Sequence, residues 1–173
     1  MHKFEYLNAF MKRIGLISDT HSVIPESVLK FMEDVDEIWH AGDIGSIEVV
    51  HKLPGNKKFR AVYGNIDGSE IRSSFNEIEV FECEGITVLL MHIGGYPGKY
   101  SKQAKEIFDS TKIDLFISGH SHILKVMYDK KLDMMHINPG AAGMSGFHEK
   151  QTAVKFVVDD QQIKDLQIFN LNR

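Results

Sequence analysis

Short apolar segments alternate with stretches of helical periodicity in the first part of the chain. The apolar segments span residues 13–18, 37–40 and 59–63. Between the first two, a helix is expected over Pro25–Val35, because its apolar residues recur at helical spacing behind a proline in the first turn. A second helix is expected from Ser46, which can cap it, to Leu53. Buried strands that alternate with helices are typical of βαβ units, so this part predicts parallel pairing.

The pattern changes from residue 77 onward to extended segments that follow one another directly. Three hairpins are expected, with turns at Gly85, at residues 129–131 and at residues 159–160. A helix from about Ser101 to Ser110 and a strand over Leu115–Ser118 separate the first hairpin from the second. The whole pattern predicts a mixed α/β domain with two sheets, in which parallel pairs dominate early and antiparallel pairs late.

The length of 173 residues suits one domain with a full hydrophobic core. We expect that domain to occupy residues 13–173, since the first strand begins at about Arg13. Residues 1–12 are interpreted as an N-terminal extension without an assigned function. Because Met11 offers a domain start of its own, the extension is either a misassigned start or a loosely ordered arm.

Charge and cysteine content exclude several classes of protein. The chain has 20 Lys and Arg residues against 24 Asp and Glu residues, which gives a net charge of −4 without a basic block for a nucleic-acid backbone. No apolar run is long enough to span a bilayer. We therefore expect no obligate nucleic-acid partner and no membrane insertion. Cys83 is the only cysteine and is expected to be a strand residue rather than a nucleophile; without a disulfide or a secretory signal, a cytoplasmic protein is expected.

Residue types that bind metal ions stand where five of the apolar segments end. Their spacing places about one strand, loop and helix between successive positions. In parallel α/β sheets such strand ends meet at one edge, so these side chains are expected to lie together. Glycines precede three of them, at Gly42, Gly64 and Gly119, where the missing Cβ allows a sharp turn. The set comprises Asp19, His21, Asp43, Asn65, His92, His120 and His122.

The seven side chains form a chemically coherent ligand set. Two carboxylates, one amide oxygen and four imidazoles suit divalent ions such as manganese, iron or zinc, and the absence of thiolates excludes a cysteine-rich structural zinc site. Seven ligands exceed the four of a closed tetrahedral site, which indicates two ions with a shared carboxylate. Asp43 is central in the order and is expected to be that bridge.

With these residues in this order, the chain resembles the calcineurin-like metallophosphoesterase family. The family pattern D-x-H, G-D, G-N, a lone His and G-H-x-H stands here at residues 19–21, 42–43, 64–65, 92 and 119–122. Within the family the chain is most similar to the small single-domain phosphodiesterases, whose NPG segment matches residues 138–140. The resemblance implies an α/β fold of two facing mixed β-sheets flanked by helices, in a four-layer sandwich over residues 13–173.

The resemblance also assigns roles to the seven residues. It implies that one ion is held by Asp19, His21 and His122, and the other by Asn65, His92 and His120, with Asp43 between them. The implied cofactors are two divalent ions, with manganese expected and iron, zinc or nickel as alternatives. The implied activity is hydrolysis of a small phosphodiester, in which a hydroxide bridging the two ions attacks phosphorus. Asn65 and His92 are the expected catalytic residues, which help to stabilise the developing charge.

One position departs from the family pattern. Many members carry a histidine after the G-N asparagine, where it stabilises the transition state or protonates the leaving group, and this chain has Ile66. Since acid catalysis contributes about a hundredfold to ten-thousandfold, we expect weaker activity toward poor leaving groups. Asp67, which would support that histidine, is expected to be a carboxylate near the ligands or the substrate.

Four further histidines have simpler interpretations. His40, on a strand that ends next to Asp43, is expected to bond to a backbone carbonyl, and contact with a metal ligand is the less favoured alternative. His51 is expected to lie at the surface and His136 to be structural. His148 follows the NPG segment in a loop, where contact with the substrate is the less favoured alternative.

Two other functions stay open on the sequence. A subunit of the retromer complex has this fold and serves as a catalytically weak interaction scaffold, which would predict lost ligands or an exposed apolar patch. A metal-dependent nuclease would need basic grooves that this chain lacks. All expected ligands are present, so the enzyme is favoured. Whether the chain forms a homo-oligomer is left open.

Overall fold

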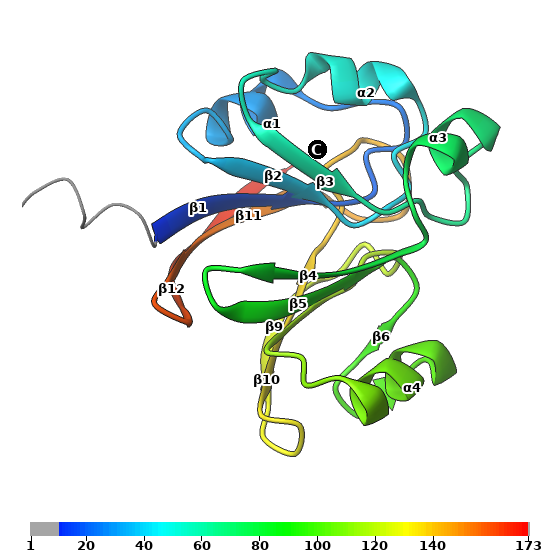
Figure 1. Cartoon of the computed structure of the whole chain (residues 1–173). Helices are drawn as coiled ribbons and strands as arrows, with labels where there is room; N and C mark the ends of the chain where they lie inside the picture. The colour runs from blue at the N-terminus through cyan, green and yellow to red at the C-terminus, as the bar shows by residue number, and fades with distance from the viewer. Residues whose placement is uncertain (1–10, 173) are drawn as a thin grey trace, which may run out of the picture.

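Two five-stranded sheets face each other in the computed structural model, which describes residues 11–172 (Figure 1). The strands of the first sheet, in their order across it, are β12 (Gln162–Asn172), β11 (Lys150–Asp159), β1 (Met11–Ile17), β2 (Glu37–His40) and β3 (Lys58–Ala61). β1 pairs in parallel with β2, and β2 with β3. β11 pairs antiparallel with both β1 and β12. The first sheet is therefore mixed.

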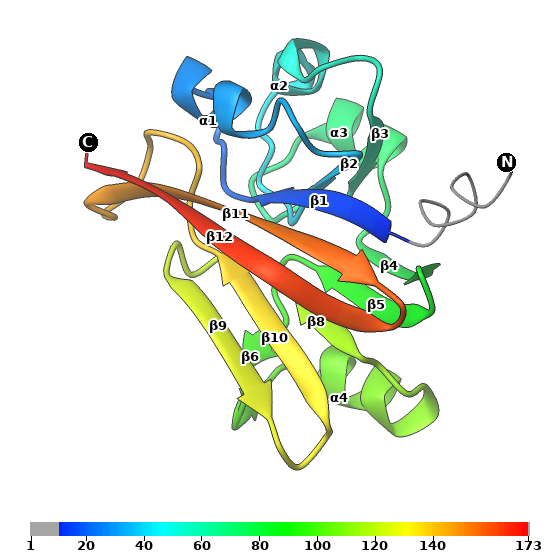
Figure 2. The same ribbon diagram turned by 90° about the vertical axis from the view of Figure 1, so that its left-hand side faces the viewer.

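The second sheet is mixed as well (Figure 2). Its strands, in order, are β4 (Ile78–Cys83), β5 (Ile86–Met91), β8 (Leu115–Ile117), β10 (Met134–Pro139) and β9 (Leu124–Asp129). Its two central pairs are parallel and its two outer pairs antiparallel. Parallel pairs dominate the early part of the chain and antiparallel pairs the late part, as expected. The exception is β8, which a helical crossover makes parallel to β5 and which also pairs in parallel with β10.

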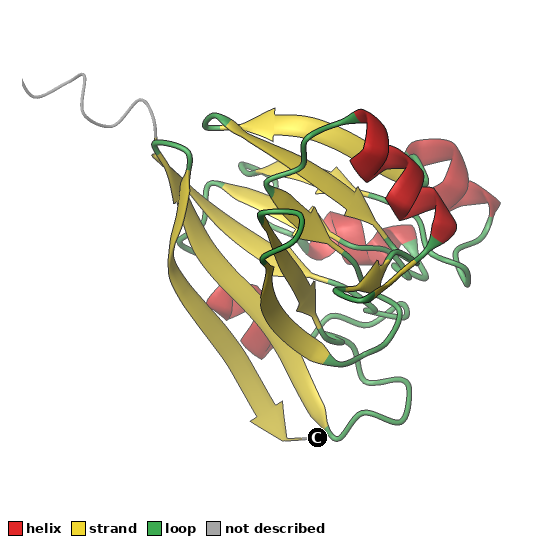
Figure 3. Ribbon diagram, turned by 90° about the horizontal axis from the view of Figure 1, so that it is seen from below, coloured by secondary structure: helices red, strands yellow, loops and turns green. Residues whose placement is uncertain are grey.

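Helices lie on the outer sides of the two sheets. The helices are α1 (Glu26–Phe31), α2 (Ile47–Lys52), α3 (Ser69–Ser74) and α4 (Lys102–Ser110). In Figure 1, α1 and α2 lie above the first sheet and α4 below the second. Figure 3 shows the same helices and strands from below. Apolar residues of α1 and α2 pack on the first sheet, and those of α4 pack on the second. The predicted sandwich of two facing sheets flanked by helices is confirmed. Among residues 11–172, no helix combines the length and hydropathy that crossing a bilayer requires.

Alternation along β1 places its side chains in two separate cores. Ile14 and Leu16 belong to the core between the sheets, whereas Ile17 packs beneath the helices. Gly15 faces α1 at very close approach, because a Cβ there would lie 2.3 Å from Sδ of Met32. The second half of β1, from Ile14 to Ile17, is therefore buried on both faces, which explains its continuous apolar sequence.

Most of the expected elements form. The three predicted hairpins are present, and α2 and α4 begin where expected, since Ser46 Oγ accepts the N–H of Glu48 at 3.2 Å and Ser101 Oγ accepts that of Ala104 at 3.1 Å. Cys83 is a buried strand residue, as predicted, and burial raises the pKa of its thiol to about 11.

The differences lie mainly at the ends of elements. α1 ends at Phe31 rather than at Val35, because the N–H of Asp36 turns to bond the carbonyl of Arg13 at 2.8 Å. β1 begins at Met11, since β11 continues alongside it as far as Asp159. α3 and the hairpin of β6 (Gly95–Tyr96) and β7 (Lys99–Tyr100) were not predicted, because elements this short carry no periodic pattern. Most of the predicted extension, residues 1–10, lies outside the described residues.

Candidate metal centre

The predicted ligand residues follow the ends of parallel strands in both sheets. β1 and β2 of the first sheet and β5 and β8 of the second lead into them. The structure brings six of the seven side chains together in two groups, and within each group the ligand atoms all lie within 4.8 Å of one another. The first ligand group is Asp19, His21 and His122, and the second ligand group is Asp43, His92 and His120. Each group therefore draws residues from both sheets.

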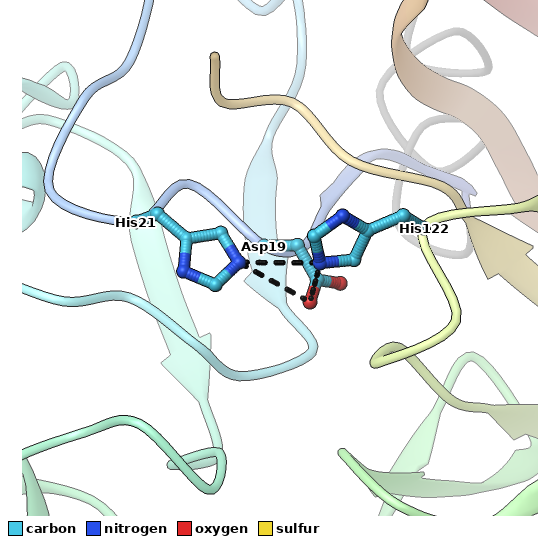
Figure 4. A group of neighbouring side chains, drawn as sticks. All are labelled: Asp19, His21 and His122. Carbon is cyan, nitrogen blue, oxygen red and sulfur yellow. Dashed lines mark hydrogen bonds and ion pairs between the residues drawn. The ribbon is translucent and has the colours of Figure 1, made fainter. Parts of the chain in front are cut away.

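The first ligand group converges through one oxygen and two nitrogens (Figure 4). Nε2 of His122 lies 3.1 Å from Oδ1 of Asp19, and Nε2 of His21 lies 3.9 Å from the same oxygen. The two Nε2 atoms are 3.2 Å apart. Three electron-pair donors so close together suit a cation between them.

The second ligand group adjoins the first. Nε2 of His92 lies 3.2 Å from Oδ1 of Asp43, and the rings of His92 and His120 meet edge to face. Oδ2 of Asp43 lies 3.9 Å from Nε2 of His21, which belongs to the first group. The two oxygens of Asp43 therefore face different groups, which is the arrangement expected of a bridging carboxylate.

Two buried ligand atoms have no hydrogen-bond partner among residues 11–172, namely Oδ1 of Asp19 and Nε2 of His92. The other oxygen of Asp19 accepts hydrogen bonds from Ser18 Oγ at 2.6 Å and from the N–H of His120 at 3.1 Å. Nδ1 of His92 lies 2.7 Å from the carbonyl of Ala41, so it carries the proton and leaves Nε2 with a free electron pair. Because unpartnered buried polar atoms are costly, these residues fit a bound cation.

The pKa shifts indicate the same charge preference. Burial opposes ionisation of Asp43, but the adjacent imidazole of His92, the N–H of Ile66 and the charge of His21 lower its pKa nonetheless. Burial also opposes protonation of His92, yet Asp43 and Asp19 outweigh it and raise the pKa of this imidazole. The carboxylates thus hold negative charge at the centre, and this charge attracts a cation.

His148 contacts a ligand from behind. Its Nδ1 lies 3.1 Å from Nδ1 of His122, and its Nε2 lies 3.0 Å from the carbonyl oxygen of Gly143. A carbonyl only accepts, so Nε2 of His148 donates and its Nδ1 accepts the proton of His122. Nε2 of His122 is then free to bind an ion. The sequence correctly placed His148 in a loop, with contact to the substrate as the less favoured alternative. It did not predict the hydrogen bond to His122.

Strained backbone carries most of the ligands. Five of the six have positive φ angles between 46° and 67°, a conformation that costs a residue other than glycine roughly 1–2 kcal/mol. Hydrogen bonds between loops hold this backbone conformation. The N–H of Asp19 donates to the carbonyl of Gly42 and the N–H of His21 to the carbonyl of Asp43, both at 3.0 Å. A Cβ at Gly64 would lie 2.0 Å from Oδ1 of Asp43, so only glycine fits there. Such strain is typical of functional sites.

Asp67 ties two ligand loops together. Its carboxylate accepts the N–H groups of Gly45 at 2.6 Å, of Gly64 at 2.7 Å and of Ile44 at 3.2 Å. The expected carboxylate near the ligands is thus a link between the loops of Asp43 and Asn65. Arg72, which the sequence did not single out, donates to the carbonyl oxygens of Asp67 at 2.7 Å and of Gly64 at 3.0 Å.

Asn65 lies at the edge of the centre. It is exposed and lines the same cleft, of about 160 Å³, as His92. The next residue, Ile66, donates its N–H to Oδ1 of Asp43 at 3.1 Å and exposes 47% of its surface. The side chains at positions 65 and 66 therefore border the second ligand group.

The remaining histidines lie outside the two groups. The prediction for His40 is wrong in its partner: its Nε2 bonds Thr20 Oγ1 at 2.9 Å, and its Nδ1 accepts the N–H of Gly42 at 3.2 Å. Burial lowers the pKa of His40 to about 4 despite the nearby carboxylates, so it stays neutral. His51 is exposed, as predicted. His136 is buried with Nδ1 3.2 Å from Phe116 O, which fits its predicted structural role.

Comparison with known proteins places this geometry in a family. Residues 11–161 match the family model of the calcineurin-like phosphoesterase superfamily domain. A probable metallophosphoesterase from Methanothermobacter thermautotrophicus is 35% identical over 136 residues, which cover 74% of this chain and 76% of that protein. A probable metallophosphoesterase from Mycoplasma genitalium is 30% identical and covers 91% of this chain and 94% of its own length.

Solved structures show the same fold at lower identity. An archaeal phosphodiesterase has a TM-score of 0.70 at 23% identity, with 92% of this chain and 99% of that chain covered. Vps29 from Entamoeba histolytica, solved with zinc, has a TM-score of 0.68 at 18% identity over 92% of this chain and 98% of its own. The family model spans most of the chain and the ligand groups stand where two sheets meet, so the chain belongs to the calcineurin-like phosphoesterase superfamily.

Proposed function

We propose that the chain is a phosphodiesterase that uses two divalent ions. One observation carries the proposal: two adjacent ligand groups face opposite oxygens of Asp43, and two of their buried atoms lack a hydrogen-bond partner within residues 11–172. Membership of the family implies a metal-dependent hydrolase. The diester substrate, the pair of ions and the role of each residue are the proposed part.

The ligand roles follow from the contacts. Asp19, His21 and His122 would hold one ion, and His92, His120 and Asn65 the other, with Asp43 shared. We propose manganese, with iron, zinc or nickel as alternatives, because the set offers only nitrogen and oxygen donors. Bound there, divalent ions supply a water of lowered pKa and positive charge opposite the phosphoryl oxygens.

The side chains position the substrate and hold protons in place. Asn65 offers an amide donor to a phosphoryl oxygen from the cleft that it shares with His92. The carbonyl of Ala41 keeps the proton of His92 on Nδ1. Ile66 cannot donate a proton to a leaving group, although it stands beside Asp43. Esters with good leaving groups are therefore better substrates than esters with poor ones.

The experiment compares a chromogenic diester, bis(p-nitrophenyl) phosphate, with the monoester p-nitrophenyl phosphate. Both are measured with Mn²⁺ and with chelator, for wild type and Asp43→Asn. Asp109→Asn, an exposed change on α4, is the matched control. Diester cleavage should require the ion, exceed monoester cleavage and fall at least a hundredfold in Asp43→Asn only. Absence of turnover with Mn²⁺, Zn²⁺, Fe²⁺, Co²⁺ and Ni²⁺ would refute the proposal.

The alternative is a catalytically weak interaction scaffold of the same fold. Vps29 structures are among the neighbours, and exposed apolar side chains near the ligand groups, such as Ile93 and Ile123, support an interaction surface. The esterase assay separates the two functions. If the protein is a scaffold, wild type should cleave the esters no faster than Asp43→Asn. We further propose a cytoplasmic protein that acts on small phosphoesters.

A further inference from the structure

Exposed apolar side chains border the ligand groups. Four of them each follow a proposed ligand by one or two positions and expose between 44% and 61% of their surface. We call these residues the apolar rim: Val23, Ile66, Ile93 and Ile123. Exposed apolar side chains beside a polar centre are candidates for contact with a ligand, because water solvates them poorly.

On the side of Ile123 the surface is hollowed into a groove of about 780 Å³, here called the side groove. Its walls include His120 and His122, one from each ligand group, so the groove is continuous with the proposed metal centre. Ile123, Leu124 and Phe147 add apolar walls. A volume of this size accommodates a small organic molecule and is far larger than a phosphate needs.

Phe147 stands fully exposed in the loop between β10 and β11. Core packing does not explain this ring, nor does it explain Ile123, which is 61% exposed on the facing loop after β8. The charged residues that line the groove, Glu149 and Lys150, are of opposite sign. The side groove therefore suits an uncharged, apolar group better than a second phosphate.

We propose that the side groove binds the organic group of the substrate, and that this group is uncharged and contains a ring. The phosphodiester would lie at the ligand groups, with the ring of its retained ester group against Phe147 and Ile123. This proposal rests on the proposed function and narrows it to one substrate class, phosphodiesters with an aryl or similarly flat ester group.

The experiment uses two esters that release the same product, p-nitrophenyl phenyl phosphate and p-nitrophenyl methyl phosphate. In each, water attacks phosphorus, the bond to the p-nitrophenyl oxygen breaks, and one proton of the water ends on p-nitrophenol. The retained group is phenyl or methyl. Each kcat/KM with Mn²⁺ is divided by the uncatalysed rate of the same ester, and wild type should favour the phenyl ester by at least about tenfold.

The variants are Phe147→Ser and Ile123→Ser, with Val80→Ser on β4 as the matched control. All three residues are exposed, so none of the changes removes core packing. Each groove variant should lower kcat/KM for the phenyl ester by about threefold to tenfold and leave the methyl ester unchanged. Val80→Ser should change neither ester.

Failure of this inference is distinguishable from failure of the proposed function. Ion-dependent turnover of both esters at equal corrected rates would overturn the inference and leave the phosphodiesterase intact, as would a phenyl preference that persists in both groove variants. If neither ester is cleaved, calorimetry of phenylphosphonate and methylphosphonate binding decides. At least tenfold tighter binding of the phenyl compound, lost in Phe147→Ser, supports the groove, and equal binding overturns it.

Discussion

Nδ1 of His148 lies 3.1 Å from Nδ1 of His122, on the side of the imidazole that faces away from Asp19. Through its other nitrogen His148 is anchored to the carbonyl of Gly143. The chain of two hydrogen bonds fixes which nitrogen of His122 is free for an ion. A contact of this kind orients a ligand and increases its basicity.

His148→Ala should therefore weaken binding of an ion by the first ligand group about tenfold or more. Calorimetric titration of the chelator-treated protein with Mn²⁺ measures this change directly, apart from any activity. His51→Ala, which removes an exposed histidine on α2, is the control and should leave the titration unchanged. Identical affinity and stoichiometry in His148→Ala and wild type would show that the contact does not orient His122.

Ile66→His should add the proton donor that this position lacks. The backbone N–H of residue 66 already bonds Asp43, and the side chain is exposed, so a histidine there can reach a leaving group without disturbing the core. We expect the rates of esters with poor leaving groups to rise by about a hundredfold, with little change for p-nitrophenyl esters. An equal rise for good and poor leaving groups would contradict acid catalysis as the cause.

His136 should make the fold sensitive to acid. Burial lowers the pKa of His136 to about 4, whereas the unfolded chain has the ordinary value of about 6.5. Above pH 6.5 both states are neutral and no stability is lost; as the pH falls from 6.5 to 4 only the unfolded state gains the proton. The free energy of unfolding should thus fall by about 3 kcal/mol from this residue.

Denaturant unfolding at pH 7.5 and at pH 4.5 measures that loss. His136→Gln keeps a donor for the carbonyl of Phe116 but no longer titrates, so its decrease between the two pH values should be smaller than that of wild type. His51→Gln is the control and should show the wild-type decrease. Parallel curves for His136→Gln and wild type would contradict the prediction.

Ion binding should stabilise the fold, because each ligand group joins residues of both sheets. At an ion concentration about 100 times the Kd, the free energy of unfolding should rise by roughly 2.7 kcal/mol. Urea unfolding with Mn²⁺ and with chelator measures the difference. Asp43→Asn should lose most of the gain and Asp109→Asn should keep it. An unchanged midpoint in wild type would contradict the two groups as ion sites.

The sequence predicted which polar residues follow the buried strands, because this order depends on local patterns. Short buried segments that end in Asp19 or His92 show where a parallel strand delivers a polar side chain, whichever strand lies beside it. The partners of these ligands depend instead on which loops meet. The bonds of His148 to His122 and of Arg72 to the carbonyl of Asp67 have no periodic signal.

The extent of each element was predictable only where local groups set it. Ser46 caps α2 through its own neighbours, so its position could be predicted. α1 stops early because Asp36 bonds Arg13, a contact that spans more than twenty positions. For the same reason, the antiparallel pairing of β11 with β1, which makes the first sheet a mixed one, could not be predicted from either segment alone.

The division of both ligand groups between the two sheets also sets an order of events during synthesis. Asp19 and His21 leave the ribosome long before His122, and the strand that carries them gains its neighbour β11 later still. A nascent chain that has emerged only through β3 can offer an ion no more than part of a coordination shell. Under the proposed function, capture of the ions would then wait until the second sheet has docked, and metal loading would mark the completion of folding rather than its start.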